Sequence, residues 1–405
     1  MYGLKQSPRA FSKHLAKCFS DLKFVCSDAD ECLWVLNLPS GTKVFALYHV
    51  DDIVMMSGDN RVRDNVFTAL AAVLDIRDEG RLDVFLGMKF EYGDDGSISM
   101  SQTHYIEKLA ERFGIVDDAK VIAPGSPDDI LSKHDLPVSE AAQVEAAKMP
   151  YPALVGSLIY ACLTRPDVNY SVSNIAMYMS RWGVKHYEHA LRVLKYLYHT
   201  RHMHLKYKKW IGDVVLTVYV DANYGDARDS GNNDKWCSQG GYLVFLGDCL
   251  VDFCSKRHRC RTLSSMEAEW VEAARAAQAA IWHRRALKDL GSEQLFPTIM
   301  WEDNKATIAF SKNHTSHDRS KHIDIREHWL RDLVLSSVIE MLHVTTANQL
   351  ADFLTKHLRA PAHKLARDIV LGGAPLPKQG HSFKEMVGCS QHWQSYKTFG
   401  GIDCF

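Results

Sequence analysis

The predicted fold of the second half of the chain is built around VVLTVYVD, residues 214–221. This stretch is an apolar, β-branched run of strand length that ends on an aspartate. By the two-residue period of a strand, Asp221 shares a face with Tyr219 and Thr217. Two further strands are predicted at GGYLVFLG and CLVDFCSK, with Gly247-Asp248 in the turn between them.

After these three strands the period changes to that of a long helix, SMEAEWVEAARAAQAAIWHRRALKDL, which ends at Gly291. The strand TIMWED, helices from about Asn304 and Lys321, the strand IEMLHVTT and a final helix ANQLADFLTKHL follow it. The order βββ-α-β-α-α-β-α predicts an α/β (α+β) domain with a mixed sheet and helices packed over it.

The ends of these elements carry four acidic residues. Asp221 and Asp303 end strands, whereas Glu269 and Asp352 lie in the first turns of helices. A lone acidic residue at such a position is usually a solvated cap, so the prediction rests on the set of four. Carboxylates that converge need cations to stay ionised, and Mg²⁺ prefers such oxygen ligands. We therefore predict a site for two Mg²⁺ ions, with Mn²⁺ as the alternative metal, and two such ions ~3.5–4 Å apart can cleave a phosphodiester.

Helix geometry selects one acidic residue among three near the start of the long helix. Glu267 and Glu269 lie roughly 200° apart around a helix, so only one of them can face the sheet. Ser264 and Glu267 have the spacing of a capping box, which gives Glu267 a local role. Glu269 is therefore the predicted ligand, and Glu272, one turn further on, is the alternative.

Composition limits the classes of function. The chain of 405 residues is 46% hydrophobic, which is enough for two or three packed domains. Its formal net charge of −1 gives no global basic field, so nucleic-acid binding must come from local patches. One such patch is SKRHRCR, where Lys256, Arg257 and Arg259 are candidate contacts to backbone phosphates. A solvated edge strand, charged against aggregation, is an equal alternative.

The sequence offers no sign of a membrane or secretory protein. No stretch approaches 18 consecutive apolar residues, and the N-terminus MYGLKQSPRAF has no apolar signal core. This indicates a cytoplasmic or nuclear protein. Ten cysteines without a CxxC pair indicate neither a zinc knuckle nor a disulfide framework.

The first half carries a second acidic group. In ALYHVDDIVMMSGD, residues 46–59, Asp51 and Asp52 follow an apolar run, and adjacent buried charges need compensation, usually by a metal ion.

Shifts in composition predict the domain boundaries. The expected parts are a mixed α and β region over residues 1–115, a polar linker rich in Pro and Asp over 116–150, a helical region over 151–212, the βββαβααβα domain over 213–358, and a tail without strong period over 359–405.

The segment 213–358 resembles the ribonuclease H domain of copia-type LTR retrotransposon polyproteins, through YVDANYGD, LSSMEAEW, WEDNKATIAF and NQLADFLTKHL. The resemblance implies a ribonuclease H-like fold that cleaves the RNA strand of an RNA–DNA hybrid. It also places the family's four metal-binding carboxylates at the four acidic residues above. Asn223 and Trp236-Cys237 depart from the family pattern, at positions expected to contact substrate.

The first part of the chain resembles the same family's reverse transcriptase palm, primer-contacting hairpin and connection, through MYGLKQSPRAFSKHL, LYHVDDIVMMSGD and YPALVGSLIYACLTRPDVNYSV. The resemblance implies that Asp51 and Asp52 are the paired polymerase aspartates, with His49 where the family usually has Tyr. In the family a further carboxylate comes from a strand before YGLKQ, where this sequence begins. We therefore expect a truncated, loosely held palm with half a polymerase site.

Three functions follow from these patterns. The leading one is an Mg²⁺-dependent ribonuclease H activity of residues 213–358. The second is a non-catalytic retrotransposon remnant that at most binds nucleic acid. The third is RNA-directed DNA polymerase activity, which requires another polypeptide to supply the missing part.

Overall fold

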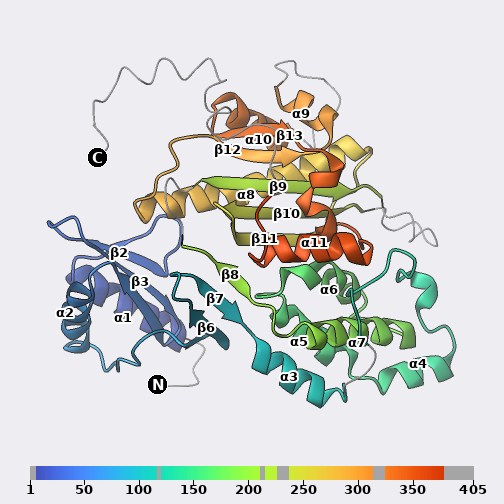
Figure 1. Cartoon of the computed structure of the whole chain (residues 1–405), viewed down its shortest axis with the longest axis horizontal. Coiled ribbons are helices and arrows are strands. Elements are labelled where there is room, and N and C mark those ends of the chain that lie inside the picture. The colour runs from blue at the N-terminus through green and yellow to red at the C-terminus, as the bar shows by residue number, and fades with distance from the viewer. Residues whose placement is uncertain (1–5, 116–119, 210–214, 226–236, 313–323, 378–405) are drawn as a thin grey trace. The chain divides into compact units, whose positions relative to one another are not determined.

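The computed structural model describes residues 6–115, 120–209, 215–225, 237–312 and 324–377 (Figure 1). The chain divides into two compact units. The first unit comprises Met1–Glu91 and Gln278–Leu295, and the second comprises Tyr92–Ala277 and Phe296–Phe405.

The first unit is built on an antiparallel sheet in which the strands follow chain order. Its strands are β1 (Val25–Cys26), β2 (Leu33–Asn37), β3 (Lys43–His49) and β4 (Asp52–Ser57), and its helices are α1 (Ser7–Asp21) and α2 (Asn60–Ala71). Alternate residues of β3 are buried, as the two-residue period of a half-buried strand predicts. The core of this unit contains Phe19 from α1, Trp34 from β2 and Leu70 from α2.

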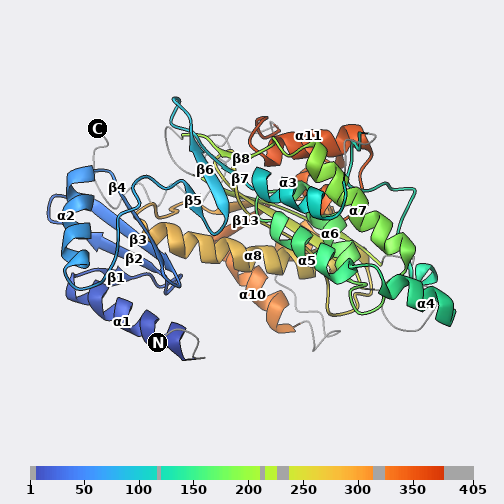
Figure 2. The same cartoon turned by 90° about the horizontal axis from the view of Figure 1, so that it is seen from below.

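A piece of a distant helix completes the first unit. The helix α8 (Ser265–Asp289) is continuous, and its residues from Gln278 onward belong to this unit (Figure 2). Trp282 Nε1 donates a hydrogen bond to the carbonyl of Ala29 at 2.8 Å. The Asp289 carboxylate accepts hydrogen bonds from Ser27 Oγ at 2.5 Å and from the Asp28 amide at 3.0 Å.

The second unit contains a five-stranded mixed sheet in the order β11-β10-β9-β12-β13. Its strands are β9 (Leu216–Asn223), β10 (Gln239–Leu246), β11 (Cys249–Arg257), β12 (Thr298–Glu302) and β13 (Ile339–His343). The first three pair antiparallel, whereas β12 is parallel to both β9 and β13. The strand order and the mixed pairing confirm the predicted ribonuclease H-like fold.

The helices between these strands also follow the prediction up to β13. They are α8, α9 (Lys305–Lys312) and α10 (Asp324–Leu335). After β13 the predicted α-helix is wrong, because the chain forms two 3₁₀ turns, η4 (Thr346–Asn348) and η5 (Leu350–Leu354). In η5 the buried residues form two i, i+3 pairs, Leu350 with Phe353 and Ala351 with Leu354, which a three-residue turn aligns on the buried side.

A helical layer precedes the mixed sheet in the second unit. Its elements are α3 (Thr103–Arg112), η1 (Lys133–Asp135), α4 (Glu140–Ala147), α5 (Tyr151–Ala161), η2 (Pro166–Val168), α6 (Asn169–Ala176) and α7 (Val184–His199). Beside this layer, β7 (Ile98–Ser101) pairs antiparallel with β8 (Leu205–Tyr207). The short strand β5 (Val84–Phe85) pairs antiparallel with β6 (Met88–Tyr92). Tyr151, Leu158, Val193 and Leu197 lie in the apolar core of the helical layer.

Two segments differ from the sequence expectation. The expected linker contains η1 and α4, and its polar residues act as helix caps, since the hydroxyls of Ser132 and Ser139 accept backbone amide hydrogen bonds. The expected tail begins with helix α11 (Ala360–Val370). Its buried face includes His363 and Arg367, and two polar residues on the buried side hide the helical period.

Candidate metal centre

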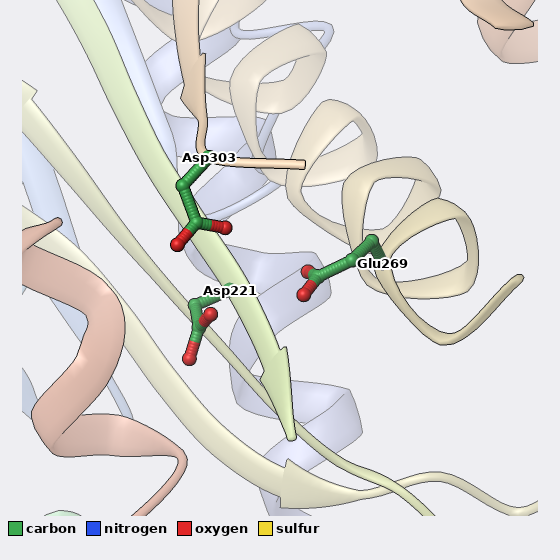
Figure 3. Close-up of side chains that lie close together, drawn as sticks. All are labelled: Asp221, Glu269 and Asp303. Atoms are coloured by element: carbon green, nitrogen blue, oxygen red, sulfur yellow. The ribbon is translucent and has the colours of Figure 1, made fainter. Parts of the chain in front are cut away.

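Three carboxylates from three separate elements meet at one edge of the mixed sheet (Figure 3). Asp221 lies on β9, Glu269 lies in the second turn of α8, and Asp303 directly follows β12. One carboxylate oxygen from each residue lies within 4.8 Å of the other two. The strands β9 and β12 are parallel neighbours, so their carboxyl ends lie at the same edge and bring Asp221 and Asp303 together.

Burial and mutual repulsion oppose ionisation of this group. Burial, and then the charge of Asp352, raises the pKa of Asp221 to about 7. Burial, and then the charge of Glu302, raises the pKa of Glu269 to about 12. Glu269 Oε2 is also buried without a hydrogen-bond partner. Crowded carboxylates with an unpartnered oxygen fit a divalent cation, because its charge restores their ionised form.

Two hydroxyl groups orient the carboxylates. Thr355 Oγ1 donates a hydrogen bond to Asp221 Oδ2, and Thr346 Oγ1 donates one to Asp303 Oδ2 at 3.1 Å. Both threonines belong to the 3₁₀ segment after β13. Hydrogen bonds from such neighbours fix the direction in which a ligating carboxylate faces its metal.

The fourth predicted carboxylate lies beside the group. Asp352 on η5 forms an ion pair with Lys356, with 2.8 Å between Oδ1 and Nζ. Its charge acts on Asp221, and burial raises its own pKa. Asp352 therefore neighbours the three carboxylates but is not within the 4.8 Å group.

The three acidic residues near the start of α8 make different contacts. The Glu267 amide donates to Ser264 Oγ at 3.1 Å, and its Oε2 accepts from the Leu263 amide at 2.5 Å, so Glu267 serves as a cap. Glu272 is fully buried and pairs with Arg275 at 2.7 Å and with His258 at 3.0 Å. Glu269 is the one placed among the carboxylates of the site.

Sequence reasoning missed Glu302, the last residue of β12. Its side chain is fully buried, Oε1 accepts a hydrogen bond from the Asn304 amide at 2.9 Å, and Oε2 has no partner. After burial, Glu302 is the largest influence on the pKa of Glu269. The sequence signal for Glu302 is WED, in which two acidic residues stand in succession at the end of a strand.

The polymerase-type aspartates lie in a different environment. Asp51 and Asp52 are exposed in the β3–β4 hairpin. His49 and Asp52 lie opposite each other in the antiparallel register of these two strands. Val50 in this turn has φ of 54°, a conformation that is rare and costly for a β-branched residue. Within the described ranges, no third acidic, His or Cys residue joins the pair in a metal-sized group.

The predicted nucleic-acid contacts lie on the outer strand β11 or directly after it. Lys256 and Arg259 are exposed, and Arg257 Nη1 lies 3.3 Å from Met177 Sδ. Asn223 is half-buried at the end of β9, Cys237 is buried, and Trp236 lies outside the described residues. Among the helices that the structure describes, none is long and apolar enough to cross a bilayer.

Comparison with known sequences identifies related proteins. Residues 1–127 match the family model described as reverse transcriptase (RNA-dependent DNA polymerase). The chain is 30% identical over 372 residues to the retrovirus-related Pol polyprotein from transposon TNT 1-94 of Nicotiana tabacum, covering 91% of this chain and 27% of that polyprotein. It is also 30% identical over 276 residues to a transposon Ty5-1 protein of Saccharomyces cerevisiae, covering 67% of this chain and 85% of that protein. The chain thus spans about a quarter of the tobacco polyprotein.

Solved structures give a weaker likeness. LC11-RNase H1, isolated from compost by a metagenomic approach, matches 35% of this chain and 91% of its own length, with 12% identity and a TM-score of 0.27. Its complex with an RNA/DNA hybrid matches 34% of this chain and 92% of its own, with 9% identity and a TM-score of 0.25. The relationship therefore rests on the sequence relatives.

Proposed function

The chain belongs to the copia-type retrotransposon Pol polyproteins, and from that membership we propose that residues 213–358 carry an Mg²⁺-dependent ribonuclease H activity on RNA–DNA hybrids. The observation that carries the proposal is the group of Asp221, Glu269 and Asp303, with oxygens within 4.8 Å at one edge of the mixed sheet. The family assignment supplies the substrate class, and the carboxylates supply the chemistry.

These three carboxylates, with Asp352 beside them, would hold the divalent ions, and Mn²⁺ would substitute for Mg²⁺ at the same oxygen ligands. When bound, two such ions activate a water and stabilise the leaving oxygen of a phosphodiester. Thr355 and Thr346 orient the carboxylates of Asp221 and Asp303. We assign contacts with the hybrid backbone to the basic stretch at the end of β11, which includes Lys256, Arg257 and Arg259.

The test is cleavage of a labelled RNA–DNA hybrid by the purified full chain. We expect cutting of the RNA strand with Mg²⁺ or Mn²⁺ and none with EDTA. Asp303→Asn should abolish the cutting, whereas Asp332→Asn, at an exposed site on α10, should leave it unchanged. Absence of cutting by folded wild-type protein would overturn the proposal.

The departures at Asn223 and Trp236-Cys237 favour a second candidate, a non-catalytic remnant that binds nucleic acid. Hybrid binding that persists in EDTA, without cleavage under any divalent metal, would establish this function instead. Filter binding and cleavage assays on one preparation distinguish the two.

Polymerase activity is the third candidate, supported by the match of residues 1–127 to the reverse transcriptase model. Two-metal polymerisation needs a further carboxylate beside Asp51 and Asp52, and the described part of the chain places none there. We expect no primer extension by this chain alone. Extension by purified protein would show that the residual site is sufficient.

A further inference from the structure

Two of the three grouped carboxylates, Asp221 and Asp303, accept hydrogen bonds from one segment, residues 346–363, which we call the strap. Its Thr346 and Thr355 donate these hydrogen bonds, and its Asp352 is the carboxylate beside the group. Its inner side is fixed to the mixed sheet. Gln349 Nε2 donates to the Val220 carbonyl at 2.8 Å.

Two further contacts show how closely the strap approaches the sheet. Ser255 Oγ on β11 donates to the Leu354 carbonyl at 2.6 Å. A Cβ at Gly241 on β10 would lie 2.5 Å from Leu354 Cβ, so only glycine fits under the strap at this point. The strap and the sheet are therefore one packed structure.

The outer side of the strap lies against residues of the helical layer. His357 of the strap packs edge-on against the Tyr170 ring of α6, with 4.8 Å between ring centroids. A Cβ at Gly125 would overlap the His357 ring, so a larger residue at Gly125 would push this ring aside. Gly125, Asp167, Tyr170, His357 and His363 line one small cavity between the two surfaces.

Behind this contact is a buried ion pair with satisfied partners. Arg165 and Asp167 are 1% and 3% exposed and form a bidentate pair, at 2.8 and 2.7 Å. Arg165 also donates to Thr200 Oγ1 at 2.7 Å, and the Tyr196 hydroxyl donates to Asp167 Oδ2 at 2.7 Å. Movement of either backbone segment would separate the two residues and leave a buried charge without its partner, which costs several kcal/mol. The pair therefore favours one backbone geometry.

One residue joins this pair to the strap. His363, at the start of α11, donates from Nε2 to the Asp167 carbonyl at 2.9 Å, and its ring lies 5.6 Å from the Tyr196 ring. The path runs from Arg165 and Asp167 through His363 to the strap, and from the strap to the carboxylates of the site.

We propose that the Arg165–Asp167 pair, acting through His363, positions the strap and thereby the metal-binding carboxylates. The helical region over residues 151–200 and helix α11 are then parts of the metal centre. A fragment limited to residues 213–358 lacks both anchors. The activity readout of this proposal rests on the proposed nuclease function, whereas metal affinity and backbone protection do not depend on catalysis.

The test compares full-length variants. His363→Leu removes the donor and should weaken Mn²⁺ binding by up to about 10-fold, no more than loss of the direct partner Thr355, because His363 acts on the carboxylates only through the strap. The same variant should speed amide hydrogen exchange in residues 353–356 and lower kcat more than it changes KM. His363→Gln keeps a donor and should restore most of the Mn²⁺ affinity.

The matched control is Tyr151→Phe, which removes a buried hydrogen bond, 2.6 Å to the Ile175 carbonyl, from the same helical core but away from the strap. It should leave Mn²⁺ affinity and strap exchange unchanged. If His363→Leu does not fold, Tyr196→Phe removes a hydrogen bond to Asp167 and disturbs the same pair, with the same direction of change expected. Wild-type Mn²⁺ affinity and exchange in folded His363→Leu or Tyr196→Phe would overturn the proposal. A wild-type protein that binds Mn²⁺ but cuts no hybrid would overturn only the nuclease function.

Discussion

Asp51 and Asp52 are adjacent in the sequence, whereas Asp221, Glu269 and Asp303 come from elements spread over more than 80 positions. The adjacent pair lies exposed in a hairpin turn, and among the described residues no third metal ligand lies near it. The dispersed group is crowded, largely buried and held by hydroxyl donors. A metal site therefore depends on convergence and support in the fold, and proximity in sequence supplies neither.

The largest expected effect is that of Glu269→Gln, which removes one carboxylate of the dispersed group. We expect hybrid cleavage to fall by at least about 1,000-fold, because residues that act as a unit fail together. Glu272→Gln, one turn further on, should retain cleavage per folded molecule, since Glu272 is paired with Arg275 and His258. Initial rates measure both, and equal losses would show that the site extends along the helix.

The pH dependence of stability distinguishes the two acidic regions in the metal-free protein. Burial and neighbouring charge raise the pKa of Asp221 to about 7 and that of Glu269 to about 12, so the folded state holds protons that the unfolded chain releases above about pH 4. Because the folded state binds more protons, stability should fall as the pH rises from about 4 through 7, and Glu269 should continue the fall above pH 7. Urea unfolding in EDTA at several pH values measures this. Mg²⁺ or Asp221→Asn should flatten the curve, and an unchanged slope would contradict the burial of this group.

The hydroxyl donors should have a smaller effect. Thr355→Val should weaken Mn²⁺ binding by about 10-fold, at the lower end of the range for outer-shell partners. Thr346→Val should cost less, because Thr346 is exposed and water can replace its hydroxyl. Thr345→Val, at an exposed neighbour without a capping bond, is the control. Calorimetric titration would reveal an error in the assignment if all three variants bound alike.

The smallest effect should come from Asp52→Asn in the exposed hairpin. Substitutions at such sites usually change stability by less than about 0.5 kcal/mol. Hybrid cleavage and Mn²⁺ affinity should match those of the wild type. A loss of either would mean that the adjacent pair takes part in metal binding.

The sequence predicts the part of the fold that local patterns encode. Periodicity identifies the three antiparallel strands and the parallel β12, and the acidic residues at their ends identify most of the metal centre. Helix geometry separates Glu269 from the capping residue Glu267. These features depend on short-range spacing, which one sequence contains.

One sequence does not predict which polar or charged side chains the fold buries beside residues that are distant in the chain. Glu302 is fully buried, which a local pattern disfavours because an unpaired buried charge is costly. Helix α11 was missed because His363 and Arg367 lie on its buried face, where the fold supplies Asp167 and Tyr196 as neighbours. The ion pair of Asp352 with Lys356 likewise depends on the 3₁₀ conformation of η5 and the burial around it.

The division of helix α8 has a consequence for synthesis. The first unit includes Gln278–Leu295 in addition to the first 91 residues. A ribosome therefore translates roughly 200 residues after the palm-like sheet before the last piece of that unit emerges. At about 5–20 residues per second, the nascent sheet waits roughly 10–40 s with Ala29 and Ser27 lacking their partners Trp282 and Asp289. Unpaired strand edges and apolar surface exposed during that interval are the features that make nascent chains prone to aggregate, and faster translation would shorten the exposure.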